Sequence, residues 1–167
     1  YKTFYVPNNA ILSIAGDMTI EETKKLVSKY FGDIPKGKGE VFRSKVVEPA
    51  LTKEIRDTIY DNVQLPMVAH TYRIPANGTP DFYAVSLLAQ LLSKGESSRL
   101  IKALVDEQQK ALNVGAFPID MEDPGVTLIY GISNMGVDPG EMEKAMDAEI
   151  EKVQKELIGD EEFQKLK

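Results

Sequence analysis

The hydrophobic pattern of the first 35 residues predicts a strand followed by a helix. Residues 10–15 (AILSIA) form a short apolar run between asparagine and Gly-Asp turn signals, which is typical of a buried strand. Apolar residues then recur at helical spacing as far as Phe31. Thr19 precedes this periodicity and Glu22 follows three residues later, which predicts a capping box at the start of the helix.

The next part of the chain predicts a connector and two strands. Residues 36–51 contain several lysines, glycine and proline with little periodicity, so we expect an extended connector. Residues 52–60 contain β-forming side chains among charged neighbours, and residues 65–74 (LPMVAHTYRI) are more apolar. Both segments are predicted as strands, and they are expected to pair.

The remaining sequence predicts helices that alternate with a strand pair. Thr79 and Pro80 open a helix of apolar periodicity that runs to about residue 92, and two serines precede another helix over residues 99–111. Residues 114–119 and 126–132 read as strands separated by a Glu-Asp-Pro-Gly turn. Asp138 opens a long amphipathic helix to about residue 157, and Asp160 begins a helix that the end of the chain interrupts.

This order of elements predicts an α+β fold with a mostly antiparallel sheet and helices on one face. We expect one domain over residues 1–167. Its parts are an opening strand and helix (1–35), a connector (36–51) and a main α+β body (52–167). Both ends of the sequence read as cuts from a larger protein, because it starts without methionine and stops within a helix.

Composition excludes several classes of site and partner. The chain has no cysteine and a single histidine, so thiol chemistry and zinc–thiolate sites are impossible. The net charge is −6 and no lysine or arginine cluster occurs, which argues against nucleic acid as a partner. The apolar runs are too short to cross a bilayer.

No catalytic or metal-binding constellation can be assembled from the sequence. His70 lies in a predicted strand without other ligands at metal-binding spacing, so we interpret it as a structural or surface residue. A serine triad would also need His70, and no G-x-S-x-G motif accompanies it. The glycines fit turns better than phosphate loops, and the paired acids fall at helix starts or in a turn.

Three stretches resemble the insulinase/pitrilysin (M16) family of zinc metallopeptidases. They are YVPNNAILSIAGD near the start, YFGDIP at the end of the first helix and LLSKGESSRL at residues 91–100. The resemblance covers nearly the whole chain and lacks the last helices of the domain. It implies the second, non-catalytic domain of a subunit, which encloses peptide substrate together with a separate domain that binds zinc through H-x-x-E-H.

The resemblance also identifies positions where this sequence departs from the family. Some members carry an arginine and a tyrosine, seven residues apart, that reach the substrate; Val105 and Leu112 stand at those positions here. Neither side chain can donate a hydrogen bond to an oxyanion. Arg99 and Asn113 remain as candidate substrate-binding residues, although exposed polar residues of this kind commonly have no ligand.

The sequence therefore predicts a chain that is inactive alone, with no catalytic and no metal site, in a parent that is a peptide-degrading zinc metallopeptidase of bacterial type. One alternative is an assembly or core-subunit domain of an M16-like protein that has lost peptidase activity. Another is an unrelated α+β ligand-binding domain. The compartment stays open, with the bacterial periplasm or cell envelope favoured over the cytoplasm.

Overall fold

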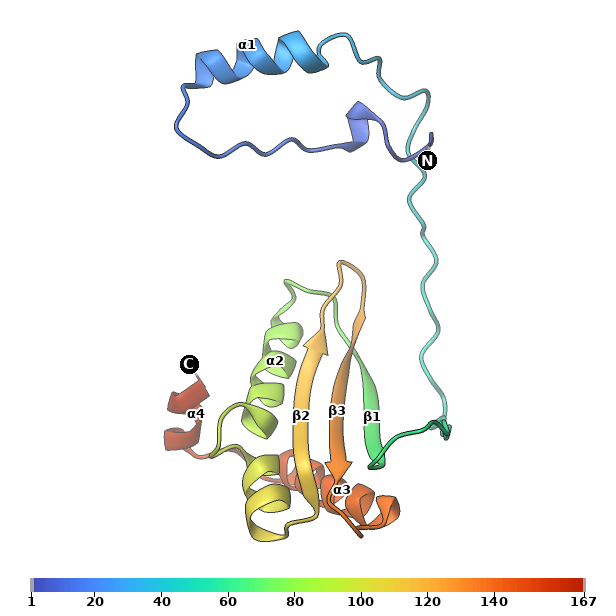
Figure 1. Ribbon diagram of the computed structural model, residues 1–167, viewed down its shortest axis with the longest axis vertical. Helices are drawn as coiled ribbons and strands as arrows, with labels where there is room; N and C mark the ends of the chain where they lie inside the picture. The colour runs from blue at the N-terminus through green and yellow to red at the C-terminus, as the bar shows by residue number, and fades with distance from the viewer. Residues whose placement is uncertain (1, 167) are drawn as a thin grey trace. The chain divides into compact units, whose positions relative to one another are not determined.

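The computed structural model describes residues 2–166 and divides the chain into two compact units, Tyr1–Asp57 and Thr58–Lys167 (Figure 1). The prediction of one domain over residues 1–167 includes Tyr1 and Lys167, and these two residues lie outside the described residues.

The first unit is built around one capped helix. A short 3-10 turn, η1 (Pro7–Asn9), is followed by helix α1 (Ile20–Phe31). The Glu22 backbone N–H donates to Thr19 Oγ1 over 3.2 Å, and the Thr19 backbone N–H donates to Glu22 Oε2 over 3.3 Å. The predicted helix and its capping box are therefore confirmed.

The predicted strand over residues 10–15 is wrong in this structure, where that segment is extended but unpaired. Its apolar side chains are exposed, and Ile11 is 99% exposed. A strand needs a neighbour to satisfy its backbone donors and acceptors, and residues 2–57 contain no other strand. An apolar run alone therefore did not produce a strand here.

The predicted strand over residues 52–60 is also wrong, because this segment has no regular hydrogen-bonded ladder. Ile55 and Ile59 are 71% and 87% exposed, so their β-forming side chains have no surface to pack against. Residues 36–51, predicted as a connector, contain no helix and no strand.

The second unit begins with a strand and a capped helix. Strand β1 (Met67–Ile74) starts two residues after the predicted boundary. Helix α2 (Pro80–Ser93) has Thr79 as its N-cap, whose Oγ1 accepts a hydrogen bond from the Phe82 N–H over 3.3 Å. The proline at the first helical position and the threonine before it explain why this helix was predictable from local sequence.

The middle of the second unit differs from the sequence prediction in one helix. Residues 99–100 are helical and lead into η2 (Ile101–Glu107), a π-helix that ends four residues before the predicted limit. Gln109 adopts a positive φ of 51°, which turns the chain into the following strand. Strands β2 (Ala111–Ile119) and β3 (Gly125–Ser133) confirm the predicted pair, and β2 begins three residues earlier than expected.

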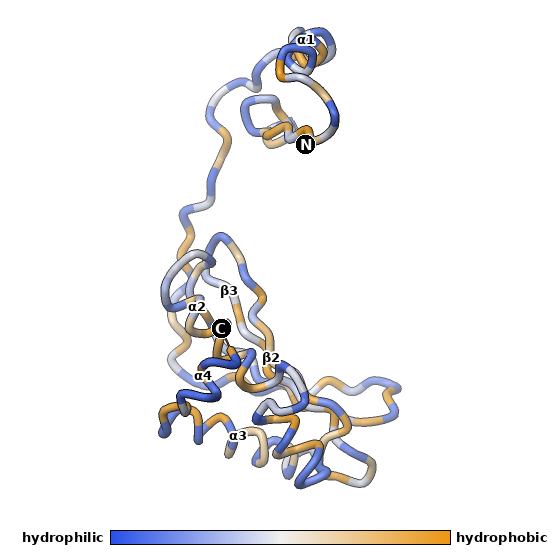
Figure 2. The backbone as a smooth tube through the Cα atoms, turned by 90° about the vertical axis from the view of Figure 1, so that its left-hand side faces the viewer, coloured by the Kyte–Doolittle hydropathy of each residue, from blue (hydrophilic) through white to orange (hydrophobic). Residues whose placement is uncertain are grey.

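Two helices complete the second unit. Helix α3 (Pro139–Lys155) has Asp138 as its N-cap, with Asp138 Oδ1 accepting from the Gly140 N–H over 2.8 Å. Figure 2 shows apolar and polar residues alternating along α3, as expected for a helix with one buried face. Helix α4 (Asp160–Leu166) is the last element.

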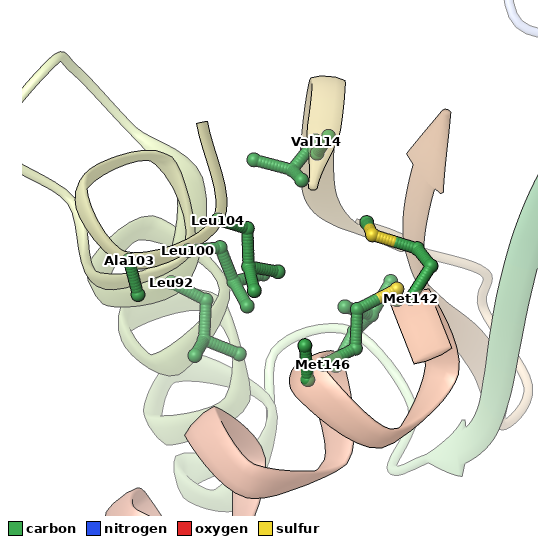
Figure 3. Packing of buried hydrophobic residues seen from close by; sticks show 10 residues of the cluster. Leu92, Leu100, Ala103, Leu104, Val114, Met142 and Met146 are labelled. Atoms are coloured by element: carbon green, nitrogen blue, oxygen red, sulfur yellow. The ribbon is translucent and has the colours of Figure 1, made fainter. Parts of the chain in front are cut away.

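The sheet is antiparallel throughout, in the order β1-β3-β2. One face packs against α2, η2 and α3 through a cluster in which Leu100, Leu104, Met142 and Met146 are all 0% exposed (Figure 3). Val114 and Ile129 are the strand residues at the centre of this contact. The predicted α+β class, with helices on one face of an antiparallel sheet, is confirmed.

Candidate functional site

The second face of the sheet, which we call the open face, points away from this core. Side chains alternate between the two faces of a strand, so Val114 and Ile129 in the core fix which residues belong to the open face. The set comprises Met67, Ala69, Thr71 and Arg73 from β1, Asn113, Gly115, Phe117 and Ile119 from β2, and Val126, Leu128, Tyr130 and Ile132 from β3.

The open face is largely apolar and partly accessible to solvent. Ile119, Phe117 and Met67 are 40%, 44% and 60% exposed, and the side chains of the central strand β3 are half-buried. Arg73 is the only residue of the set with a formal charge. A contiguous apolar area of this kind is typical of a surface that contacts another molecule or domain.

A small group of side chains on β2 and β3 gives the open face its shape. The Tyr130 ring lies over Gly115, where an added Cβ atom would clash with the ring. The Tyr130 hydroxyl donates to Asn113 Oδ1 over 3.2 Å. The Phe117 and Tyr130 rings form an edge-to-face pair with centroids 6.3 Å apart. Gly115 therefore provides the space in which the tyrosine ring can lie along the sheet.

The outer edge of β2 is closed to a further strand near its centre. The Ser93 hydroxyl, at the end of α2, accepts from the Ala116 N–H over 2.7 Å and donates to the Ala116 carbonyl oxygen over 3.0 Å. Pro118 lies two residues further along the same edge and has no N–H to donate. Contact with another chain at β2 is therefore expected through the open face rather than through this edge.

The two candidate substrate-binding residues from the sequence lie in different surroundings. Asn113 is on the open face beside Tyr130. Arg99 instead donates two hydrogen bonds to Glu162 of α4, over 2.9 Å from Nε and 2.7 Å from Nη2. These hydrogen bonds hold the pKa of Glu162 below its usual range and raise that of Arg99. The structure thus gives Arg99 a partner within this unit.

Val105 and Leu112, which stand in place of the arginine and tyrosine of some family members, lie in different surroundings. Val105 is partly buried and packs against the core cluster. Leu112 is 58% exposed and lies at an irregularity in the β2–β3 register between Ala111 and Asn113. Both side chains are aliphatic, so neither can supply a hydrogen bond to a reacting oxygen.

His70 lies on β1 and faces helix α3. Its Nδ1 is 3.4 Å from Asp147 Oδ1 and its Nε2 is 3.9 Å from Glu143 Oε1, and its side chain is 14% exposed. These contacts link the strand to the helix. Within residues 2–166, no group of three or more histidine, aspartate or glutamate side chains could hold a metal ion. The side chains of residues 2–166 therefore do not fit a zinc site.

Sequence reasoning did not identify Tyr130, Gly115 or Phe117 as site residues. The available signal was a glycine inside an otherwise apolar strand, which often marks a close approach of another group. Which residue approaches that glycine depends on the register of β2 against β3, with Gly115 opposite Tyr130. Spacing along one strand cannot supply this information.

The fold and the sequence place this chain in a known family. The family model described as the peptidase M16 inactive domain matches residues 1–167, and the chain belongs to this family. The zinc protease PqqE of Helicobacter pylori is 28% identical over 169 residues, covering 100% of this chain and 38% of the relative.

Solved structures agree with this assignment. The crystal structure of a protease from Helicobacter pylori matches with a TM-score of 0.77 and 27% identity, over 99% of this chain and 40% of that one. A peptidase M16 inactive domain from Pseudomonas fluorescens matches with a TM-score of 0.64 over 90% of this chain and 36% of that one. At 19% identity, the second match shows the fold alone.

The family assignment establishes a non-catalytic domain of the kind found in zinc-protease-like proteins. It confirms the resemblance to M16 peptidases that the sequence motifs indicated. The chain spans about two fifths of the length of the first relatives that it matches. Across residues 2–166, no helix is both long and apolar enough to cross a membrane.

Proposed function

We propose that this chain is the non-catalytic half of a peptide-binding chamber in a zinc metallopeptidase, where it acts beside a zinc-bearing domain of the same polypeptide. The observation that carries the proposal is the open face, an apolar sheet surface on the side opposite α2, η2 and α3 of the same unit, in a member of the M16 inactive-domain family. An unfolded peptide exposes apolar side chains that this surface can receive.

The chemistry of peptide hydrolysis is assigned to the other domain. The described part of this chain has no metal-holding group, and the zinc protease that it resembles is more than twice as long as the matched region. Zinc in that other domain would supply the activated water for hydrolysis. This chain would contribute binding and enclosure, which raise catalytic efficiency by holding the peptide near the zinc.

The proposal is tested in the whole parent protein with two matched substitutions. Ile119 on the open face is 40% exposed, and Leu88 on α2 is 38% exposed. We expect Ile119→Glu to lower kcat/KM for an unfolded peptide at least about ten-fold, because a charge on the apolar face must be desolvated when peptide binds. Leu88→Glu should leave kcat/KM within about two-fold.

Zinc content and thermal unfolding are measured on both variants, so that loss of metal or of fold is separated from loss of binding. Equal effects of the two substitutions on folded, zinc-loaded protein would contradict the role of the open face. A parent that binds no zinc and hydrolyses no peptide would contradict the peptidase assignment and favour the assembly-domain alternative.

A further inference from the structure

We infer that Tyr130, Gly115, Phe117 and Asn113 form a subsite on the open face for one aromatic or branched aliphatic side chain of an extended peptide, and that this peptide carries a positive charge. The inference rests on the proposed function and adds the class of peptide that the domain selects.

The apolar half of the subsite is the aromatic pair. The Phe117 and Tyr130 rings meet edge to face at an interplanar angle of 73°, and Phe117 stays 44% exposed. This arrangement leaves aromatic surface accessible beside the ring that lies over Gly115. A third aromatic or aliphatic side chain can pack there, and aromatic pairs contribute beyond simple burial of area.

The polar half is the Asn113 side chain. Its Oδ1 accepts the Tyr130 hydroxyl over 3.2 Å, which orients the amide group. That bond leaves the two amide N–H donors available to a carbonyl oxygen. A donor fixed beside an apolar contact suits a peptide, in which every side chain is followed by a backbone carbonyl.

The charge around the subsite favours a basic peptide. The turn between β2 and β3 contains three carboxylates, those of Asp120, Glu122 and Asp123, and it adjoins the Ile119 and Val126 end of the open face. Asp120 accepts from Asn77 Nδ2 over 2.8 Å. Arg73 on β1 stands opposite Val126 at the same end, so three carboxylates face one cation there and the charge is net negative. A lysine or arginine of the peptide can lie near this turn, whereas an acidic residue would be repelled.

The occupant is expected to be a peptide chain in extended conformation. Open-face side chains on β3 recur at every second residue, roughly 7 Å apart, which is also the spacing of same-side residues in an extended peptide. Ser93 and Pro118 obstruct strand addition at the β2 edge, so a peptide at β2 is expected to lie on the open face, along β3, rather than beside that edge. Its alternate side chains then meet alternate positions of the sheet.

The test uses the full 167-residue chain, labelled with nitrogen-15, and a blocked heptapeptide with two phenylalanines at alternate positions and a lysine near each end. One comparison peptide replaces the phenylalanines by serine, and another replaces the lysines by glutamate. Chemical-shift changes of backbone amides locate the contact and give Kd. We expect shifts at Val126, Leu128 and their neighbours, and at least about five-fold weaker binding of the serine peptide.

Binding of the glutamate peptide should also be weaker, by about three-fold or more in dilute buffer, and this difference should shrink as salt is added. Tyr130→Ala should weaken binding of the phenylalanine peptide about five- to ten-fold. Tyr83→Ala is the matched control, because Tyr83 is an exposed tyrosine on α2, outside the open face. It should leave Kd unchanged.

The outcomes separate the subsite from the proposed function. If the unaltered chain and Tyr130→Ala show the same open-face shift changes and the same Kd, the subsite is overturned and the peptide-binding face is retained. Shifts confined to the helices, or no binding of either peptide, would overturn both. If Tyr130→Ala does not fold, the comparison of phenylalanine and serine peptides on the unaltered chain decides: equal Kd values overturn the subsite.

Discussion

Two serines beside the sheet have opposite hydrogen-bonding situations. Ser93 Oγ bonds both the N–H and the carbonyl oxygen of Ala116. Ser133, at the end of β3, is 0% exposed, and its Oγ has no hydrogen-bond partner among the described residues. A buried hydroxyl without a partner loses its hydration and gains nothing in return, so the two side chains should contribute to stability with opposite sign.

We therefore expect Ser133→Ala to raise the free energy of unfolding by about 1 kcal/mol, because it removes the unsatisfied hydroxyl. Ser93→Ala should lower the free energy of unfolding by about 1–2 kcal/mol, because it leaves the Ala116 backbone groups unpaired. Urea denaturation of the two variants and of the unaltered chain measures both values. A greater loss in Ser133→Ala than in Ser93→Ala would contradict this assignment.

Val105 and Leu112 provide a second comparison at single residues. Val105 packs against the core, so Val105→Ala should lower the free energy of unfolding by about 1–2 kcal/mol through lost contacts and a small cavity. Leu112 is 58% exposed, so Leu112→Ala should change the free energy of unfolding by less than about 0.5 kcal/mol.

Neither substitution removes a hydrogen-bond donor, so kcat of the folded parent protein should stay within about two-fold for both. Thermal unfolding and peptide hydrolysis of each variant check these expectations. A large fall in kcat for a fully folded Leu112→Ala protein would show that this side chain acts on the substrate by packing.

Elements with local signals were predictable from the sequence, and pairings between distant residues were not. The caps at Thr19, Thr79 and Asp138 each depend on residues within three positions, and all three were found. The segments at 10–15 and 52–60 had suitable side chains for strands, but a strand also requires a neighbour that local sequence does not specify. Propensity identified β-forming residues and could not supply their partners.

In the candidate site, too, single residues were predictable from the sequence and their distant partners were not. Asn113 was named from its place in the sequence, but its partner Tyr130 lies 17 residues further on and depends on the β2–β3 register. Arg99 was also named, yet Glu162, 63 residues away, occupies its guanidinium. The family was recognisable from motifs alone, whereas the residues of the open face became visible only with the sheet in place.

The Arg99–Glu162 pair makes the attachment of α4 sensitive to acid. Because the folded pKa of Glu162 is depressed, the pair contributes stability above the usual glutamate pKa, and this contribution is lost as pH falls through the depressed value. The Arg99 pKa is raised and lies far above this range, so only the carboxylate titrates. We expect α4 to detach progressively below about pH 4, with a loss of about 1 kcal/mol.

The protection factor of the Phe163 amide in hydrogen exchange, which is corrected for the intrinsic pH dependence of exchange, reports this loss; this amide donates to the Gly159 carbonyl oxygen. Glu162→Gln should lower the protection factor near neutral pH and remove most of its acid dependence. Glu161→Gln is the control, because Glu161 forms no ion pair with the described residues. An unchanged acid dependence in Glu162→Gln would show that another group holds α4.

At the scale of the whole chain, burial is distributed unequally between the two units. All residues of the core cluster belong to Thr58–Lys167, whereas α1 has no buried residue. Leu26, Tyr30 and Phe31 on α1 are each more than half exposed. Burial of apolar area is the main favourable term in folding, so stability should reside in the second unit.

The last prediction concerns fragments that correspond to the two units. Residues 58–167 alone should unfold cooperatively in urea, because they contain the sheet and the complete core cluster. Residues 1–57 alone should show little helix by circular dichroism and no cooperative transition. Their single helix of 12 residues is near the length at which isolated helices are marginal in water, even with the capping box at Thr19. A cooperative transition in the 1–57 fragment would show a core in the first unit that the exposure of its apolar side chains does not indicate. A 58–167 fragment that fails to fold would show that the sheet needs apolar contacts from outside that unit.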